Sequence, residues 1–260
     1  MPGYSLSDSK DTHQRRGELM PYTITPLLVG VRNVDQGIMT YQQGYGKRIW
    51  LPMWAFLLRE KGGEGRTVIV DTGLEDFVNP PEFIEDTGLE ALFMDEALEQ
   101  QGLTANDVDA VINTHLHDDH CGNNPMFENT PIYVQRAELE ACLHPHPLDY
   151  RYEPSFVEDL DVRPVEGDTE IFPGITLMAT PGHTPGSQAV KVETEDGPVV
   201  ITGMCCSGEN FPENGPAICP GVHCDAFSAY DEIQKLKALR DQGATLLPLH
   251  ELSLAGKTIG

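Results

Sequence analysis

The chain has 260 residues, of which 40% are hydrophobic, and this suits one large domain or two small domains with a buried core. Seventeen basic residues stand against 41 acidic ones, and a net charge of −24 makes nucleic acid and anionic membrane surfaces unfavourable partners. No run of about 18 apolar residues occurs, so we expect no membrane-spanning helix. Six cysteines are too few for a disulfide-stapled scaffold.

Residues 1–20 are polar, carry charges of both signs and have no periodicity, so we predict an N-terminal arm followed by one domain over residues 21–260. The arm contains no apolar segment of the kind that a secretory signal needs. Four of the six cysteines lie between residues 205 and 224, a crowding that indicates reduced thiols. We therefore expect a cytoplasmic protein.

The first half of the domain begins with segments that are rich in β-branched and aromatic residues and are separated by turns containing glycine. We predict strands in these segments, at residues 23–31, 50–60 and 67–73. Residues 80–105 are predicted to be helical, because Leu92, Leu98 and Leu103 mark one apolar side among acidic residues. A buried type of strand is predicted over residues 108–114.

The second half alternates short β-rich segments with two helical ones. Strands are predicted at residues 131–135, 162–167, 169–180, 187–194, 198–203 and 244–250. Helices are predicted at residues 136–143 and 228–242, the second of which is amphipathic.

Three imidazoles and two carboxylates lie within six residues, directly after the predicted strand at 108–114. They are His115, His117, Asp118, Asp119 and His120. A loop that leaves a strand can aim several such side chains at one point, which a helix with this spacing could not do. Neutral imidazole suits Zn²⁺, Fe or Ni²⁺, and carboxylate adds a harder ligand. The spacing therefore predicts a metal site at the end of this strand.

Together with the Asp-Thr-Gly sequence at 71–73 and TPGHTPGS at 180–187, the motif HLHDDH resembles the metallo-β-lactamase superfamily over roughly residues 22–260. Within that superfamily, the segments PMWAFLLR, HDDHCGN, TPGHTPG, GENF and QKLKAL are most similar to the N-acyl-homoserine lactonases. The resemblance implies a fold of the α+β class: an αββα sandwich of two mixed β-sheets flanked by helices, with the metal site at one edge. It makes residues 21–260 a hydrolase domain of this type.

The resemblance also implies six metal ligands in two groups of three. They are His115, His117 and His183 for a first ion, and Asp119, His120 and His250 for a second ion. Asp119 would in addition be catalytic, because it can pass a proton to the leaving group. Asp118 is the variable residue of the motif and is expected to point elsewhere. We expect zinc, with iron or manganese as alternatives, as one firmly held ion and a weaker second one.

The sequence departs from the family after the strand at 198–203, where most dinuclear relatives carry an aspartate that bridges the metals. Met204 occupies the expected place, and no acidic residue occurs from 203 through 208. Three interpretations are compatible with this departure. Cys205 or Cys206 binds metal as a thiolate, the second ion is loose or absent, or the metal chemistry is lost. An aspartate substituted for Met204 is expected to tighten the second site.

The expected activity is that of a metal-dependent hydrolase in which hydroxide on the metal attacks a carbonyl ester, with a lactone as substrate. Trp54 and Phe56 are expected to line an apolar substrate pocket, with core packing as the alternative. Alternative functions are hydrolysis of an ether, aryl or thioester bond on the same scaffold, or a weakly active or inactive companion subunit. The expected partner is a small molecule, and a homodimer or a hetero-oligomer with a homologue is compatible with the sequence.

Overall fold

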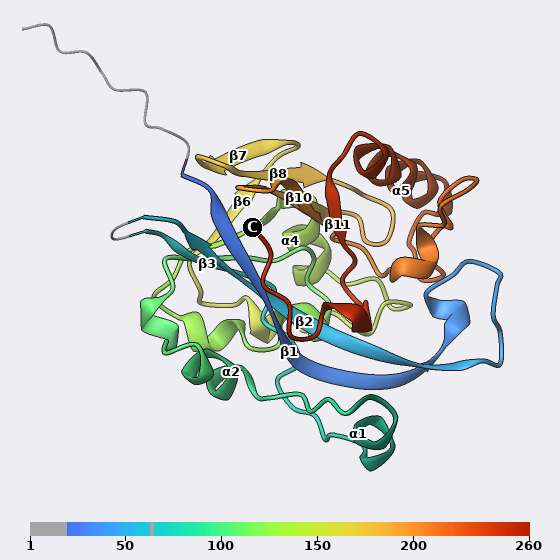
Figure 1. The fold of residues 1–260 in the computed structure, drawn as a ribbon, viewed down its shortest axis with the longest axis horizontal. Helices are drawn as coiled ribbons and strands as arrows, with labels where there is room; N and C mark the ends of the chain where they lie inside the picture. Colours follow the sequence, from blue (N-terminus) through green and yellow to red (C-terminus); the bar gives the residue numbers. More distant parts are fainter. Residues whose placement is uncertain (1–19, 63–64) are drawn as a thin grey trace, which may run out of the picture.

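The computed structural model describes residues 20–62 and 65–260, which form two β-sheets packed face to face with helices on the outside (Figure 1). The predicted arm at 1–20 lies outside the described residues apart from Met20. No helix within the described ranges has the length and apolar character that a bilayer crossing requires. The αββα sandwich predicted from the sequence is confirmed.

The first sheet contains six strands in the order β1-β2-β3-β4-β5-β6. Pairing is antiparallel between β1, β2 and β3, and parallel from β3 through β6, so the sheet is mixed. The strands are β1 (Tyr22–Asp35), β2 (Arg48–Glu60), β3 (Thr67–Val70), β4 (Ala110–Ile112), β5 (Ile132–Gln135) and β6 (Val162–Val165).

The second sheet contains five strands in the order β11-β10-β9-β8-β7. It is also mixed, because β10 and β11 are parallel and the other neighbours are antiparallel. The strands are β7 (Thr169–Phe172), β8 (Ile175–Ala179), β9 (Gln188–Thr194), β10 (Gly197–Ile201) and β11 (Thr245–Leu247).

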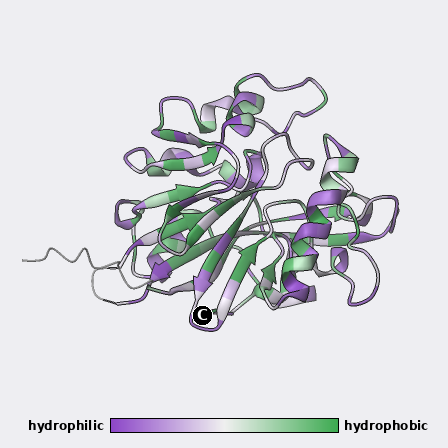
Figure 2. Cartoon of the chain, turned by 90° about the horizontal axis from the view of Figure 1, so that it is seen from above, coloured by the Kyte–Doolittle hydropathy of each residue, from purple (hydrophilic) through white to green (hydrophobic). Residues whose placement is uncertain are grey.

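The helices cover the outer faces of both sheets, and their exposed sides are hydrophilic whereas the strands are largely hydrophobic (Figure 2). They are α1 (Pro81–Thr87), α2 (Met94–Gln100), α3 (Asp118–Cys121), α4 (Arg136–Leu143) and α5 (Ala226–Asp241). The single helix predicted over 80–105 is wrong, because Gly88 adopts a left-handed φ of 69° that ends α1. Helix α5 begins two residues earlier than predicted, where the Asp225 carboxylate accepts hydrogen bonds from Phe227 N and Ser228 N.

The main core lies between the sheets, and alternation along β2 decides which residues reach it. Trp54 and Phe56 face the second sheet and are buried there, whereas Ala55 and Leu57 face α2. The expected position of Trp54 and Phe56 in the substrate pocket is therefore corrected, since both belong to the core and neither lines the metal cavity described below.

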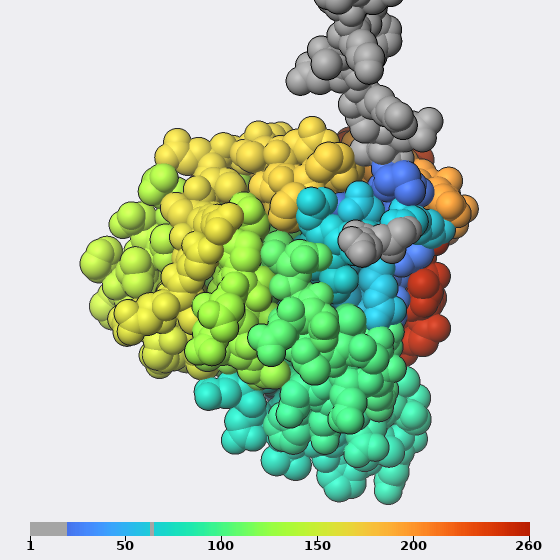
Figure 3. Space-filling view, turned by 90° about the vertical axis from the view of Figure 1, so that its left-hand side faces the viewer, coloured from blue at the N-terminus to red at the C-terminus, as the bar shows by residue number. Residues whose placement is uncertain are grey.

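The C-terminal segment closes the open edge of the first sheet. Ile259 pairs with Ile24 of β1, and the two backbone hydrogen bonds measure 2.8 and 2.9 Å. Figure 3 shows the N-terminal strands in blue beside the C-terminal segment in red on one face of the molecule. The segment that follows β11 of the second sheet thus pairs with the edge strand β1 of the first sheet.

Candidate metal centre

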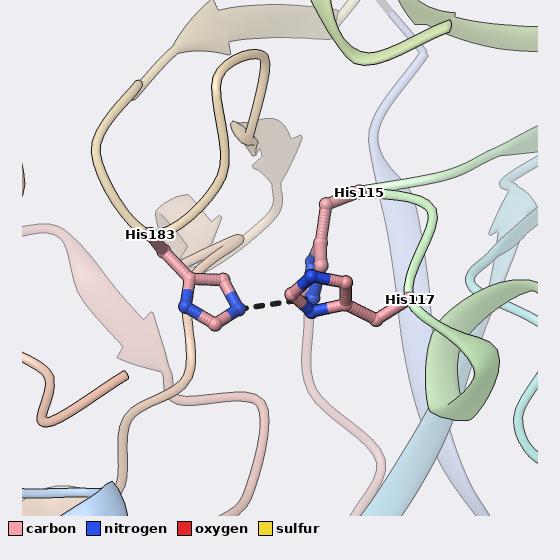
Figure 4. Close-up of side chains that lie close together, drawn as sticks. All are labelled: His115, His117 and His183. Atoms are coloured by element: carbon pink, nitrogen blue, oxygen red, sulfur yellow. Dashed lines mark hydrogen bonds between the residues drawn. The ribbon is translucent and has the colours of Figure 1, made fainter. Parts of the chain in front are cut away.

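The histidines predicted as first-ion ligands meet at strand ends that are distant in sequence. His115 and His117 follow β4, and His183 lies in the loop between β8 and β9. Figure 4 shows the rings of His115 and His117 approaching His183 from the opposite side, and the Nε2 atoms of His115 and His183 are 3.2 Å apart. The prediction of a loop after the strand is right for residues 115–117 only, because α3 begins at Asp118 as one helical turn.

Two groups of three donors occur among the described residues. The ligand atoms of His115, His117 and His183 lie within 4.8 Å of one another, and so do those of His115, Asp119 and His120. All five side chains are buried, and the groups share His115, so they are adjacent. His250 belongs to neither group, although its ring centroid lies 5.3 Å from that of His120 and it lines the same cavity.

The hydrogen bonds of two histidines to backbone carbonyls fix which ring nitrogen carries the proton. Nδ1 of His183 faces the carbonyl oxygen of Val222 at 2.8 Å, and Nδ1 of His250 faces that of Pro52 at 2.9 Å. A carbonyl oxygen only accepts, so each Nδ1 must donate, and each Nε2 keeps its lone pair. Supporting hydrogen bonds of this kind are typical of histidines that bind metal.

A carboxylate below the motif orients two further rings. Asp71, at the end of β3, accepts hydrogen bonds from Thr114 Oγ1 at 2.7 Å and from His120 Nδ1 at 2.8 Å. Because the Thr114 hydroxyl gives its proton to Asp71, its oxygen accepts from His115 Nδ1 at 3.1 Å. His115 Nε2 therefore also carries a lone pair. Asp71 holds this position with a left-handed φ of 60°, which is uncommon for a residue other than glycine.

The donor chemistry fits a divalent cation. Nε2 of His115 and Nε2 of His183 both carry lone pairs, and they face each other at 3.2 Å in a buried place. Two facing lone pairs repel unless a proton or a cation lies between them. A third imidazole, His117, and the Asp119 carboxylate lie next to them, and this is a donor set that zinc and related metals bind.

Burial and neighbouring charges keep most of these groups in metal-binding form. Burial, together with neighbouring imidazoles, holds the pKa of His115 and of His183 well below the usual range and lowers the pKa of His250 to about 4. Burial also opposes charge on Asp119, but the nearby histidines outweigh it and lower the pKa of that carboxyl. For His120, Asp119 and Asp71 outweigh burial and raise the pKa to about 9, so a bound cation would displace a proton there.

The donors open into a cavity of about 480 Å³ with mixed walls. Its lining joins the donor groups with apolar side chains from the β1–β2 hairpin, from the loop after α4 and from the loop before α5. The apolar members are Val34, Ile38, Leu51, Leu148 and Val222, with the aromatic ring of Tyr150 at 90% exposure. A small molecule with an apolar part could contact these walls while a polar bond faces the donors.

The variable residue of the motif faces this cavity. Asp118 was expected to point away from the metal ligands; it lines the outer part of the same cavity and pairs with Arg32, with Nη2 and Oδ2 at 2.6 Å. It belongs to neither donor group. The reason is that α3 starts at Asp118, so its side chain leaves the helical turn toward β1 rather than toward His183.

The three residues after Gly203 alternate between two sides, with Met204 and Cys206 in one apolar cluster and Cys205 at the metal cavity. Cys205 lines the metal cavity, with its Sγ 3.4 Å from Met39 Sδ. Cys206 is buried on the other side, where its thiol pairs with Thr202 Oγ1 at 3.0 Å. Met204 is fully buried in the apolar cluster between the second sheet and α5. The residue that takes the cavity-facing position is therefore Cys205, and not Met204 as expected.

Sequence reasoning missed the side chains that support the ligands. Asp71 was marked only by its motif, although an acid that ends a buried strand is a recognisable signal. Asp149 pairs with His117 and gave no signal, because its loop is 32 residues away in sequence. Glu138, buried on α4, accepts from Leu116 N at 2.9 Å and from Gly186 N at 3.0 Å, and so connects the two loops that carry the histidines.

Residues 48–203 match the family model of the metallo-beta-lactamase superfamily. The chain belongs to this superfamily, and its fold and donor groups are those of a metal-dependent hydrolase. The resemblance inferred from the sequence is thereby confirmed.

Named relatives within the superfamily are lactonases. The chain is 37% identical to the N-acyl homoserine lactonase AiiA of Bacillus thuringiensis subsp. kurstaki over 204 residues, 74% of this chain and 78% of that protein. It is 36% identical to an N-acyl homoserine lactonase of a Bacillus species over the same shares. A solved structure of a quorum-quenching N-acyl homoserine lactone hydrolase superposes with a TM-score of 0.73 at 28% identity, covering 92% of this chain and 96% of that one.

Proposed function

We propose that this protein is a lactonase that opens the ester ring of N-acyl homoserine lactones or closely similar lactones. The observation that carries the proposal is the pair of facing lone pairs on His115 and His183, buried beside His117 at the base of an open cavity. The relatives named as lactonases support the choice of substrate class.

The residues proposed to hold the first ion are His115, His117 and His183, and zinc is the proposed metal. The second ion is proposed to be weaker and to be held by Asp119, His120 and His250, with Cys205 as a further candidate. The weakness follows from the missing carboxylate at residues 203–208, since a bridging carboxylate offsets the repulsion between two cations. Cys206 is a poorer candidate than Cys205, because its thiol faces Thr202.

When bound, a divalent ion supplies a Lewis acid that polarises a carbonyl and lowers the pKa of water. The protein supplies the remaining functions. The Asp119 carboxylate is ionised and buried beside His120, so it can accept a proton from the attacking water and deliver it to the alkoxide oxygen of the opened ring. The apolar cavity walls would hold the acyl chain and exclude water from part of the site.

A substrate panel tests the proposal. Purified zinc-loaded protein is assayed with N-hexanoyl homoserine lactone, a simple aliphatic thioester, a nitroaryl ether and a β-lactam. We expect ring opening of the lactone to dominate, and to be lost in His117→Ala but kept in the matched control His144→Ala, which removes an exposed imidazole outside the donor groups. Preference for the thioester or the ether would replace this function with another hydrolysis, and no turnover of any substrate would favour a companion subunit.

A reducing cellular compartment is also proposed. The six cysteines are all free thiols, and five of them are buried. Cytoplasmic location follows if these thiols must stay reduced. Fractionation of the native cells tests this, and recovery of the protein from an oxidising compartment would contradict it.

A further inference from the structure

The loop between α4 and β6 lies against the metal motif and is fastened to it. His117 and Tyr152 form an antiparallel backbone bridge, and the Asp118 N–H donates to the carbonyl oxygen of Arg151 at 2.9 Å. The Tyr152 hydroxyl donates to the buried Glu138 carboxylate at 2.9 Å. The part of the loop that follows residue 148 is therefore held in register with His117.

Asp149 in this loop divides its two oxygens between a ring and a guanidinium. Its Oδ2 lies 3.2 Å from His117 Nε2, and its Oδ1 accepts from Arg151 Nε at 2.7 Å. Its backbone N–H donates to the carbonyl oxygen of His146 at 2.8 Å. The side chain is 17% exposed, so the carboxylate is held between the ring and the guanidinium in a largely enclosed place.

His117 differs from the other four histidines in the nitrogen that its supporting partner occupies. His115, His120, His183 and His250 use Nδ1 for support and leave Nε2 free. His117 uses Nε2 for support, which leaves Nδ1 as the only ring nitrogen with a lone pair for an ion shared with His115 and His183. A proton on Nδ1 would remove this lone pair, so the tautomer of His117 decides whether its ring can bind a metal ion.

We propose that Asp149 is a positioning residue that holds His117 with the proton on Nε2 and so presents Nδ1 to the metal. This inference rests on the proposed role of His117 as a ligand. The loop between α4 and β6 would thus contribute to metal affinity through Asp149. This residue belongs neither to the donor groups nor to the histidine motif. Arg151 acts through Asp149, because its Nε fixes which oxygen faces the ring.

The two neighbours of Asp149 in sequence point into the metal cavity rather than toward the His117 ring. Effects on metal affinity can therefore be separated from effects on substrate contact. Leu148 and Tyr150 are 84% and 90% exposed and both line the metal cavity. Truncation of Tyr150 should therefore change contact with substrate, as a change in KM. It should leave the affinity for metal unchanged, because the hydrogen bonds of Asp149 do not involve Tyr150.

The substitution Asp149→Asn tests the tautomer directly. Arg151 Nε donates a proton, so it will bind the amide oxygen of the new side chain, and the amide NH₂ group will face His117 Nε2. Nε2 must then accept, which moves the ring proton to Nδ1 and blocks the lone pair needed for metal. Loss of a supporting partner commonly lowers metal affinity about 10–100-fold.

The measurement is competition between the metal-free protein and a chromophoric chelator for Zn²⁺. We expect Asp149→Asn to weaken the tighter binding step about 10–100-fold. The matched control is Asp161→Asn, which alters an aspartate–arginine pair of the same 2.7 Å length at an exposed place away from the histidines, and it should leave the affinity unchanged. In the double variant Asp149→Asn with Arg151→Met, the amide is free to turn its oxygen to the ring, so part of the affinity should return.

Nitrogen NMR of the histidine rings gives a second readout that needs no variant. In the metal-free parent we expect the His117 proton on Nε2, and finding it on Nδ1 would overturn the proposal. Unchanged affinity in Asp149→Asn, with a large loss in His117→Ala, would also overturn the role of Asp149 while leaving the proposed function intact. Unchanged affinity in His117→Ala would instead remove the proposed function on which the inference rests.

Discussion

Replacing Met204 or Cys205 by aspartate should have opposite consequences, although the two residues are neighbours. The sequence led us to expect that Met204→Asp would tighten a second metal. In the structure, Met204 is fully buried among apolar side chains of the second sheet and α5, so its substitute cannot reach the donor groups. Cys205 lines the metal cavity, so Cys205→Asp would place a carboxylate there.

The size of the Met204→Asp effect follows from this burial. Truncating a buried methionine costs about 2–5 kcal/mol of stability, because packing is lost and a cavity forms. Burying a carboxyl group without a partner adds about 1–3 kcal/mol even when the group becomes protonated. The sum is a large share of a typical unfolding free energy of about 5–15 kcal/mol. We therefore expect Met204→Asp to be strongly destabilised with or without zinc.

Cys205→Asp should behave differently in the presence of metal. The new carboxylate would lie in the same cavity as Asp119, so the two charges repel in the metal-free protein and stabilise a second cation when it is bound. A ligand present at 100 times its Kd adds about 2.7 kcal/mol to the unfolding free energy. Zinc should thus raise the Tm of Cys205→Asp by more than it raises that of the parent.

Urea unfolding and thermal melts of both variants, with and without zinc, measure these effects. Cys205→Ser is the matched control, because it keeps the size of the side chain while removing the thiolate. A folded Met204→Asp protein that binds a second zinc more tightly than the parent would refute the assignment of side-chain directions given above.

The remaining predictions concern ligands, support and capping. His117→Ala should lose nearly all bound zinc and activity, as elemental analysis and a lactone assay would record; wild-type values would contradict the ligand role. Asp71→Asn should reduce the unfolding free energy by about 1.5–3 kcal/mol, since charged hydrogen bonds to His120 and its neighbours are lost in a fully buried place. Hydrogen bonds from Ser228 and the first turn of α5 lower the pKa of Asp225. The cap therefore stabilises the fold above the unfolded pKa of about 4 and loses this effect as the pH falls through the lower folded pKa. The Tm difference between parent and Asp225→Ala should accordingly shrink in acid, and a difference independent of pH would be inconsistent with this cap.

The positions of most strands along the chain and the clustering of the first three histidines could be predicted because both depend on local sequence. The β-rich segments carry their own hydrophobic patterns, and residues 115–120 place several donors within one turn. His183 was predictable only through the resemblance, since nothing in its own neighbourhood states which distant loop it meets.

Side-chain direction and long-range support could not be predicted from the sequence. Trp54 and Phe56 fit either face of a strand until the position of the second sheet is known. The same holds for Met204 and Cys205, because the sequence does not state which side of the alternating segment 204–206 faces the cavity. Asp149 reaches His117 across a connection whose path is determined by tertiary packing.

A cation held by His115, His117 and His183 is proposed to make this chain a lactonase. The most direct measurement is the rate of N-hexanoyl homoserine lactone opening, followed by acid release, as metal-free protein is titrated with Zn²⁺. We predict no activity without metal and a rise in rate as the tighter binding step is filled. Ring opening by the metal-free protein, or none at saturating zinc, would contradict it.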